Sequence, residues 1–160
     1  MEDRIQALVG IANNKLSTAD HLAYTTYPTV REPKLLLSII EDIFVGVSAG
    51  MDAILLYERM FKRVPPHTSD LMTRIDVFKT KCAERYNFNR EVMVMLIDIQ
   101  RLLEFNRKSA MQIAKRDKLV IFEDDYRMKS ITIESVKNYL TLSKPFIEKV
   151  NKVLVNVGRY

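Results

Sequence analysis

The sequence predicts an all-α protein, a single-domain bundle of about five helices around one long central helix, spanning residues 1–160. Three observations predict this fold class. Thirty-one residues between Pro33 and Pro65 repeat apolar side chains every three or four positions, which is the spacing of one helix. Only four glycines and five prolines are present, which leaves little material for tight turns. A hydrophobic content of 48% in 160 residues is enough for one buried core.

The central segment is long enough to cross a membrane, so its charged residues decide how it is interpreted. Glu41, Asp42 and Asp52 would lie within the hydrocarbon, at a cost of about 2.5–3.5 kcal/mol each near its centre. We therefore expect a buried helix of a protein that does not enter a membrane.

The N-terminal segment predicts the first helix, from Asp3 to about Tyr27. Its apolar residues recur on one face: Ile5, Leu8, Val9, Ala12, Leu16, Ala19 and Ala23. Pro28 is expected to end this helix, because proline has no N–H and cannot continue a helical ladder. The central helix then begins after Pro33.

Two further helices are expected in the middle of the chain. Thr68–Asp70 is a cluster of N-cap residues, and the helix after it carries one apolar stripe of Leu71, Ile75, Phe78 and Cys82. Asn87–Asn89 predicts a turn, and a fourth helix follows to about Phe105. Ser109 is expected to cap a short extra helical turn through Ala114.

Residues 118–131 interrupt the helical pattern. The apolar run Leu119–Phe122 is followed by three acidic residues and then by further β-branched and aromatic residues. This arrangement predicts a short hairpin or an irregular insert. Thr132 is then expected to cap the last helix, and Pro145 is expected to kink or divide that helix.

Composition bounds the compartment and the partners. A single cysteine excludes an internal disulfide and fits a reducing compartment. The first residues run straight into an amphipathic pattern without a signal core, so we expect a cytoplasmic protein. A net charge of +5 permits contact with nucleic acid or an anionic surface without requiring it.

The motifs that usually identify enzymes are missing from this sequence. It has no Gly-rich phosphate loop, no Cys-x-x-Cys pair and neither of the usual helical His and Glu metal spacings. We therefore assign no catalytic residue and no cofactor, and do not expect an enzyme. Glu41, Asp52 and Asp98 are the only weak candidates for a metal site, with solvated helix faces as the alternative. Cys82 is expected to be a small buried hydrophobe.

Gly46 and Gly50 lie one helical turn apart in the central helix, beside two alanines. Small residues at this spacing let another helix backbone approach closely. Two interpretations remain open: a tight crossing within the bundle, and a self-association face that would make the protein a homodimer.

The basic residues concentrate late in the chain. The candidate nucleic-acid contacts are Arg107, Lys108, Lys115, Arg116, Lys118, Arg127 and Lys129, with Tyr126 as a stacking residue. Basic residues interleaved with aromatic ones suit phosphate contact combined with base stacking. A solvated charged surface explains the same residues without a ligand.

Parts of the sequence resemble the HEPN class of small bundles, named for higher eukaryotes and prokaryotes nucleotide-binding. The resemblance lies in Ala19–Leu22 with Tyr24, and in the long second helix. The chain also looks like small archaeal helical proteins of unknown function, through Phe78–Cys82 and Tyr126–Lys129. HEPN ribonucleases carry an arginine followed, after four to six residues, by a histidine, and neither histidine of this chain has an arginine at that distance.

The resemblance therefore implies the binding and dimer-forming habit of such bundles and not their ribonuclease activity. The sequence as a whole predicts a non-enzymatic, self-associating interaction module. Nucleic-acid binding is the alternative, and a metal-dependent enzyme comes third.

Overall fold

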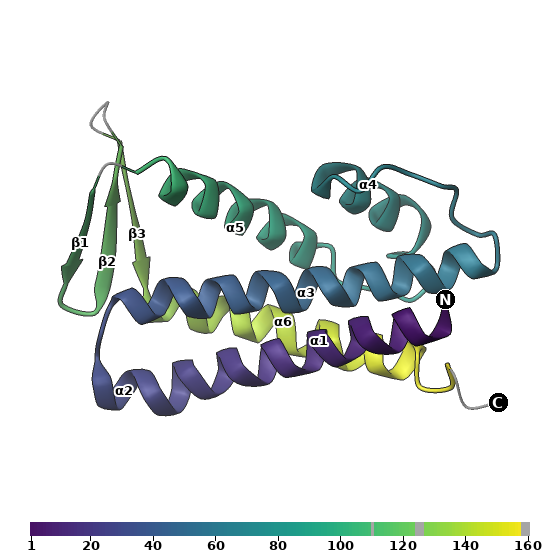
Figure 1. The fold of residues 1–160 in the computed structure, drawn as a ribbon, viewed down its shortest axis with the longest axis horizontal. Helices are drawn as coiled ribbons and strands as arrows, with labels where there is room; N and C mark the ends of the chain where they lie inside the picture. The colour runs from purple at the N-terminus through teal and green to yellow at the C-terminus, as the bar shows by residue number, and fades with distance from the viewer. Residues whose placement is uncertain (110, 124–126, 158–160) are drawn as a thin grey trace.

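The computed structural model describes residues 1–109, 111–123 and 127–157. Most of the chain is helical, and a small three-stranded sheet lies at one end (Figure 1). The three longest helices are α1 (Glu2–His21), α3 (Lys34–Met60) and α6 (Ile133–Val153), and each contacts the other two. Two shorter helices, α4 (Leu71–Lys81) and α5 (Glu91–Arg107), cover the remaining side of α3 (Figure 1).

The long central helix predicted between the two prolines is confirmed as α3. Its buried residues come from most of its circumference, because α1, α4, α5 and α6 all pack against it. The largest fully buried side chains of α3 are Leu36, Ile39, Ile40, Ile43, Met51 and Ile54. The fold is therefore organised around this helix, as its apolar pattern predicts.

The expectation that Pro28 ends the first helix is wrong. Helical structure continues through a π-helical turn, η1 (Leu22–Thr26), into the short helix α2 (Tyr27–Val30). The wider turn starts a new helical register, so Pro28 lies in a first turn, where its missing N–H is not needed. Arg31, with φ of 50°, ends the helix, and its N–H donates to the Tyr27 carbonyl at 2.8 Å.

The middle of the chain follows the predicted order of cap, helix, turn and helix. Asp70 caps α4 by accepting a hydrogen bond from the backbone N–H of Thr73 at 3.0 Å. The predicted apolar stripe, which includes Cys82, is buried. Asn87, with φ of 55°, lies in the turn before α5.

The fold is not purely all-α, because three short strands between the last two helices form an antiparallel sheet. Its strands are β1 (Met111–Lys115), β2 (Lys118–Phe122) and β3 (Met128–Thr132), in the order β1-β2-β3. The predicted insert is confirmed as the β2–β3 hairpin. The helical turn expected from Ser109 through Ala114 is wrong, because residues 111–115 form β1. The apolar strand β2 pairs with β1 on one edge and with β3 on the other.

The inner face of this sheet joins the core. Leu119, Ile121 and Ile131 are buried there among the helices. The opposite face carries the half-exposed side chains of Met111 and Met128.

The last helix begins as predicted. Thr132 and Ser135 form a reciprocal capping box at the start of α6. Pro145 does not divide the helix. Pro145 and Thr141, whose carbonyl loses its helical partner, are both exposed, so water can solvate that carbonyl.

Across the described ranges, none of the helices combines the length and the apolar character needed to cross a membrane.

Candidate anion-binding pocket

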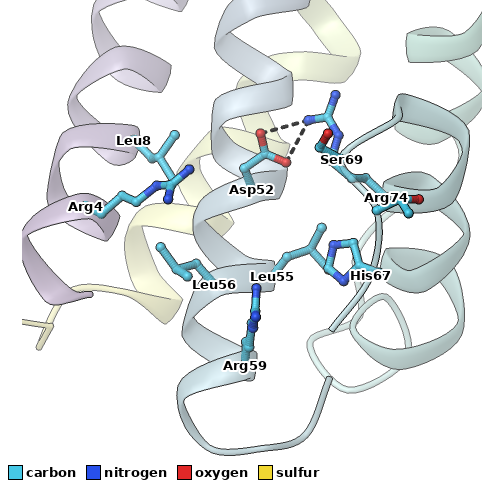
Figure 2. Close-up of a pocket in the computed structure, with 10 residues that line it drawn as sticks. Arg4, Leu8, Asp52, Leu55, Leu56, Arg59, His67, Ser69 and Arg74 are labelled. Carbon is cyan, nitrogen blue, oxygen red and sulfur yellow. Dashed lines mark hydrogen bonds and ion pairs between the residues drawn. The ribbon is translucent and has the colours of Figure 1, made fainter. Parts of the chain in front are cut away.

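A pocket of about 240 Å³ opens to solvent between α1, α3 and the segment that leads into α4 (Figure 2). It lies at the end of the bundle opposite the sheet (Figure 1). We call it the arginine pocket. Its lining residues are Arg4, Leu8, Asp52, Leu55, Leu56, Arg59, His67, Thr68, Ser69 and Arg74.

The fold brings three arginines to this pocket from three different elements. Arg4 lies near the start of α1 and Arg59 near the end of α3, and these ends meet because the two helices run antiparallel. Arg74 comes from the first turns of α4. Figure 2 shows Arg4 beside Leu8 on the α1 side of α3, His67 and Arg74 on the opposite side, and Arg59 on α3 itself. With Asp52 as the one carboxylate among the lining residues, the pocket carries a net positive charge.

Arg74 is held at the edge of the pocket by Asp52. The Nη1 of Arg74 donates to both carboxylate oxygens of Asp52, each at 2.8 Å. The Nε of Arg74 is buried and has no hydrogen-bond partner among the residues that the structure describes. A buried donor without a partner costs about 1–3 kcal/mol. A ligand oxygen that reached this Nε would remove that cost.

The floor of the pocket is apolar. Leu55 is buried, and Leu8 and Leu56 are partly buried where α1 packs against α3. Guanidinium groups above a leucine floor suit a ligand that combines an anionic head with an apolar body.

The segment before α4 is held in place by its own hydrogen bonds. The Asp70 carboxylate accepts from the hydroxyl of Thr68 at 2.5 Å and from the hydroxyl of Thr73 at 2.7 Å. These bonds favour the charged form and lower the pKa of Asp70 to about 2. The His67 Nδ1 lies 3.1 Å from the Pro65 carbonyl oxygen, which can only accept, so Nδ1 carries the proton.

The buried carboxylate of Glu58 binds residues on both sides of α4. Glu58 is fully buried, and the Nε of Arg63 donates to it at 2.5 Å. The Tyr86 hydroxyl also donates to Glu58, and the Nε of Arg85 lies 3.9 Å away. Glu58 thereby joins the end of α3 to the segment on each side of α4, which fixes where α4 lies beside the pocket.

Glu58 also changes the acidity of its neighbours. Burial raises the pKa of the Cys82 thiol to about 12, and the negative charge of Glu58 adds to this effect. Burial and the hydrogen bond to Glu58 raise the pKa of Tyr86. Cys82 is thus a buried thiol held in its protonated form, as expected for a structural residue.

Sequence reasoning did not identify the arginine pocket or Glu58. A signal for Glu58 exists, because it follows Ile54 by four positions and Leu55 by three and so falls on a buried stripe of α3. No comparable signal marks Arg4, Arg59 and Arg74. They are far apart in the sequence, and each looks like an ordinary solvated residue.

The three carboxylates considered as metal ligands do not converge. Glu41 and Asp98 are exposed, and Asp52 is paired with Arg74. Among the described residues, no group of three or more His, Cys, Asp or Glu side chains could hold a metal ion.

Gly46 and Gly50 lie at helix crossings within the chain. A Cβ at Gly46 would lie 3.2 Å from the Lys15 Cβ and 3.3 Å from the Ala12 carbonyl oxygen of α1. A Cβ at Gly50 would lie 2.9 Å from the Ile147 Cδ1 of α6. Both positions are covered by helices of the same chain, so they do not offer a face to a second copy.

The late basic residues lie at both ends of the sheet. Lys115 and Lys118 are paired across β1 and β2 at one end of the sheet, with exposed Arg116 in the turn between them. Arg107 and Lys108 precede the other end of β1. Strands of this length separate the two ends by roughly 13 Å.

The other members of the proposed nucleic-acid surface are engaged elsewhere. Arg127 pairs with Glu123 at 2.7 Å. The Nζ of Lys129 lies 5.0 Å from the centre of the Phe105 ring. Tyr126 falls outside the described residues.

Comparison of the chain with family models, with curated proteins and with solved structures finds no match. The resemblance to the HEPN class and to small archaeal proteins stays a prediction.

Proposed function

We propose that the protein is a cytoplasmic, non-enzymatic binding module that takes an anionic group in the arginine pocket. The observation that carries this proposal is the convergence of Arg4, Arg59 and Arg74 on one hollow whose single lining carboxylate is Asp52. Guanidinium groups are the side chains best suited to carboxylate and phosphate oxygens.

The state of Arg74 supports the same proposal. Its Nε is buried and without a partner among the described residues, although its Nη1 is well bonded to Asp52. The binding of an anion satisfies this donor and offsets the repulsion among the three arginines. The hydroxyls of Thr68 and Ser69 line the same pocket and add neutral donors.

The test is a titration with sodium sulfate at constant ionic strength, followed by NMR of the arginine Nε–Hε groups. Saturable shifts are expected for Arg4, Arg59 and Arg74, together with a rise in melting temperature. Arg59→Gln should weaken binding by about tenfold, since a charge-assisted hydrogen bond is lost. Arg107→Gln, at the opposite end of the molecule, is the matched control. If sulfate binding weakens equally in both variants, the response reflects general charge screening and not a site.

Nucleic-acid binding is the second candidate function. The observation that favours it is the cluster of Lys115, Arg116 and Lys118 at one end of the sheet, close to Arg31, whose Nη1 lies 4.0 Å from Asp117. Anisotropy of labelled single-stranded RNA, measured across salt concentrations, tests it. Binding through this cluster weakens log-linearly with salt, because neutralised phosphates release counterions.

The matched variants for this test reverse charge at the two ends of the sheet. Changing Lys115 and Lys118 to Glu should abolish RNA binding, whereas changing Arg107 and Lys108 to Glu, which alters the net charge equally, should preserve most of it. Equal losses would indicate attraction by net charge and would remove the cluster as a site.

Self-association is proposed on the resemblance to dimer-forming bundles, through a surface other than Gly46 and Gly50. Light scattering across the micromolar range tests it. A constant monomer mass would remove the dimer from the proposed function.

A further inference from the structure

The arginine pocket has a charge and a shape that specify more than a generic anion. We infer that its ligand is a phosphate monoester attached to a small apolar body. This inference rests on the proposed anion-binding function and narrows it to one class of ligand.

The charge of the pocket matches a dianion. Three arginines and one aspartate line it, which leaves two positive charges in excess. A phosphate monoester carries a charge of about −1.5 to −2 near pH 7, whereas a carboxylate or a sulfate ester carries a single negative charge. A monoester therefore neutralises the pocket, and a monoanion leaves it positive.

The direction of the donors matches a tetrahedral head group. Arg4, Arg59 and Arg74 reach the pocket from α1, α3 and α4, on different sides (Figure 2). A carboxylate offers two oxygens in one plane, which one guanidinium fork can satisfy. A phosphate monoester offers three strong acceptor oxygens that point in different directions. Three donors from three sides therefore favour the phosphate.

Arg74 can join such a ligand without leaving Asp52. The aspartate uses only Nη1 of the guanidinium, so Nε lacks a partner among the described residues. Because Nε is buried in this structure, its contact with a ligand requires a rotation of the Arg74 side chain about its bond to Asp52. Asp52 thus positions Arg74 and is not itself a ligand contact.

The leucine floor specifies the rest of the ligand. Leu8 and Leu56 are only partly buried, and they line the hollow beside the arginines. Burial of an apolar body against them removes water from both surfaces, which adds affinity that inorganic phosphate does not have.

The experiment compares phenyl phosphate, phenyl sulfate and inorganic phosphate by calorimetry at pH 7.5 and constant ionic strength. We expect phenyl phosphate to bind about tenfold more tightly than phenyl sulfate, which has the same shape and one charge less. It should also bind several-fold more tightly than inorganic phosphate. Leu8→Ala should reduce that second preference, with the melting temperature of the variant as a check on its folding.

Two sources of the ester are separated by a further probe, a short peptide that carries phosphotyrosine. Binding tighter than that of phenyl phosphate identifies a phosphorylated protein, and weaker binding identifies a free small ester. Both results retain the shared chemistry.

Different results would overturn the phosphate inference and the proposed anion-binding function. Equal affinity for phenyl phosphate and phenyl sulfate, with both lost in Arg59→Gln, would overturn the phosphate inference and leave the anion pocket intact. If none of the three anions binds, or if Arg59→Gln changes no affinity, the proposed function itself is lost.

Discussion

Arg74 on α4 and Asp52 on α3 are joined through a single guanidinium nitrogen, which lies 2.8 Å from each of the two carboxylate oxygens. The pair is partly exposed, so its direct contribution to the free energy of unfolding is only about 0–1 kcal/mol. Its structural effect is to fix the direction of an arginine at the edge of the pocket. Asp52 also places a negative charge where an anion would bind.

Asp52→Asn should therefore increase the affinity for sulfate, by up to about tenfold at low salt. The amide oxygen still accepts from Arg74, while the opposing charge is gone. Calorimetry at low and high ionic strength measures the gain, which should shrink as salt screens it. Asp76→Asn, an exposed change on α4 outside the pocket, should leave the affinity unchanged. A weaker affinity in Asp52→Asn would mean that Arg74 needs the full carboxylate to stay in position.

Glu58→Ala should lower the free energy of unfolding by about 3 kcal/mol or more. The change removes the acceptor for Tyr86 and Arg63 and leaves a cavity between α3 and the segments beside α4. Urea unfolding measures the loss. Glu104→Ala, at an exposed position of α5, is the control and should change stability by no more than about 0.5 kcal/mol. Equal free energies of unfolding for the two variants would show that the contacts of Glu58 do not stabilise the fold.

Gly46→Val should lower the free energy of unfolding by at least about 1–3 kcal/mol. Its new Cβ meets the backbone of α1, which cannot move aside without separating α1 from α3. Gly10→Val makes the same chemical change on α1 with no atom within 4 Å of the new Cβ, and it should be nearly neutral. Both variants make the same change in helix propensity. The difference between their free energies of unfolding, measured by heat and by urea, therefore reports the steric cost at Gly46 alone.

The Asp70 carboxylate makes stability depend on pH in the acid range. Its pKa falls from 3.8 to about 2 in the folded protein, so the folded state favours the charged form. The resulting stability is fully present above pH 3.8 and is lost as the pH falls to about 2. Asp70→Asn keeps an N-cap residue but removes the titration. The stability difference between the natural protein and this variant should therefore disappear by about pH 2, as measured by urea midpoints. A difference that stays constant across this range would contradict the assignment.

Much of the fold could be predicted because its signals are local. The apolar pattern of α3, the caps at Asp70 and Thr132 and the turn at Asn87 each depend on residues a few positions apart. Strand β1 could not be predicted in this way. All five of its residues are exposed, so the strand has no buried face that its sequence could mark, and it is held by backbone pairing with β2.

Pro28 shows a second limit of local reasoning. Its missing N–H correctly predicts a break in the α-helical ladder, but the chain absorbs that break in a π-helical turn. Whether such a break ends a helix depends on what the next turn packs against. Tyr27, which follows the π-helical turn, is buried in the core.

The sequence by itself determined the helices, their caps and the central position of α3, because each depends on residues that are close along the chain. The arginine pocket was decided only by the tertiary structure. Arg4, Arg59 and Arg74 meet because α1 and α3 pack antiparallel and because buried Glu58 fixes the segments on each side of α4. The sequence around a charged residue on a solvated helix face does not indicate which residues lie near it in the fold. The three arginines therefore line one pocket only because of the way the helices pack.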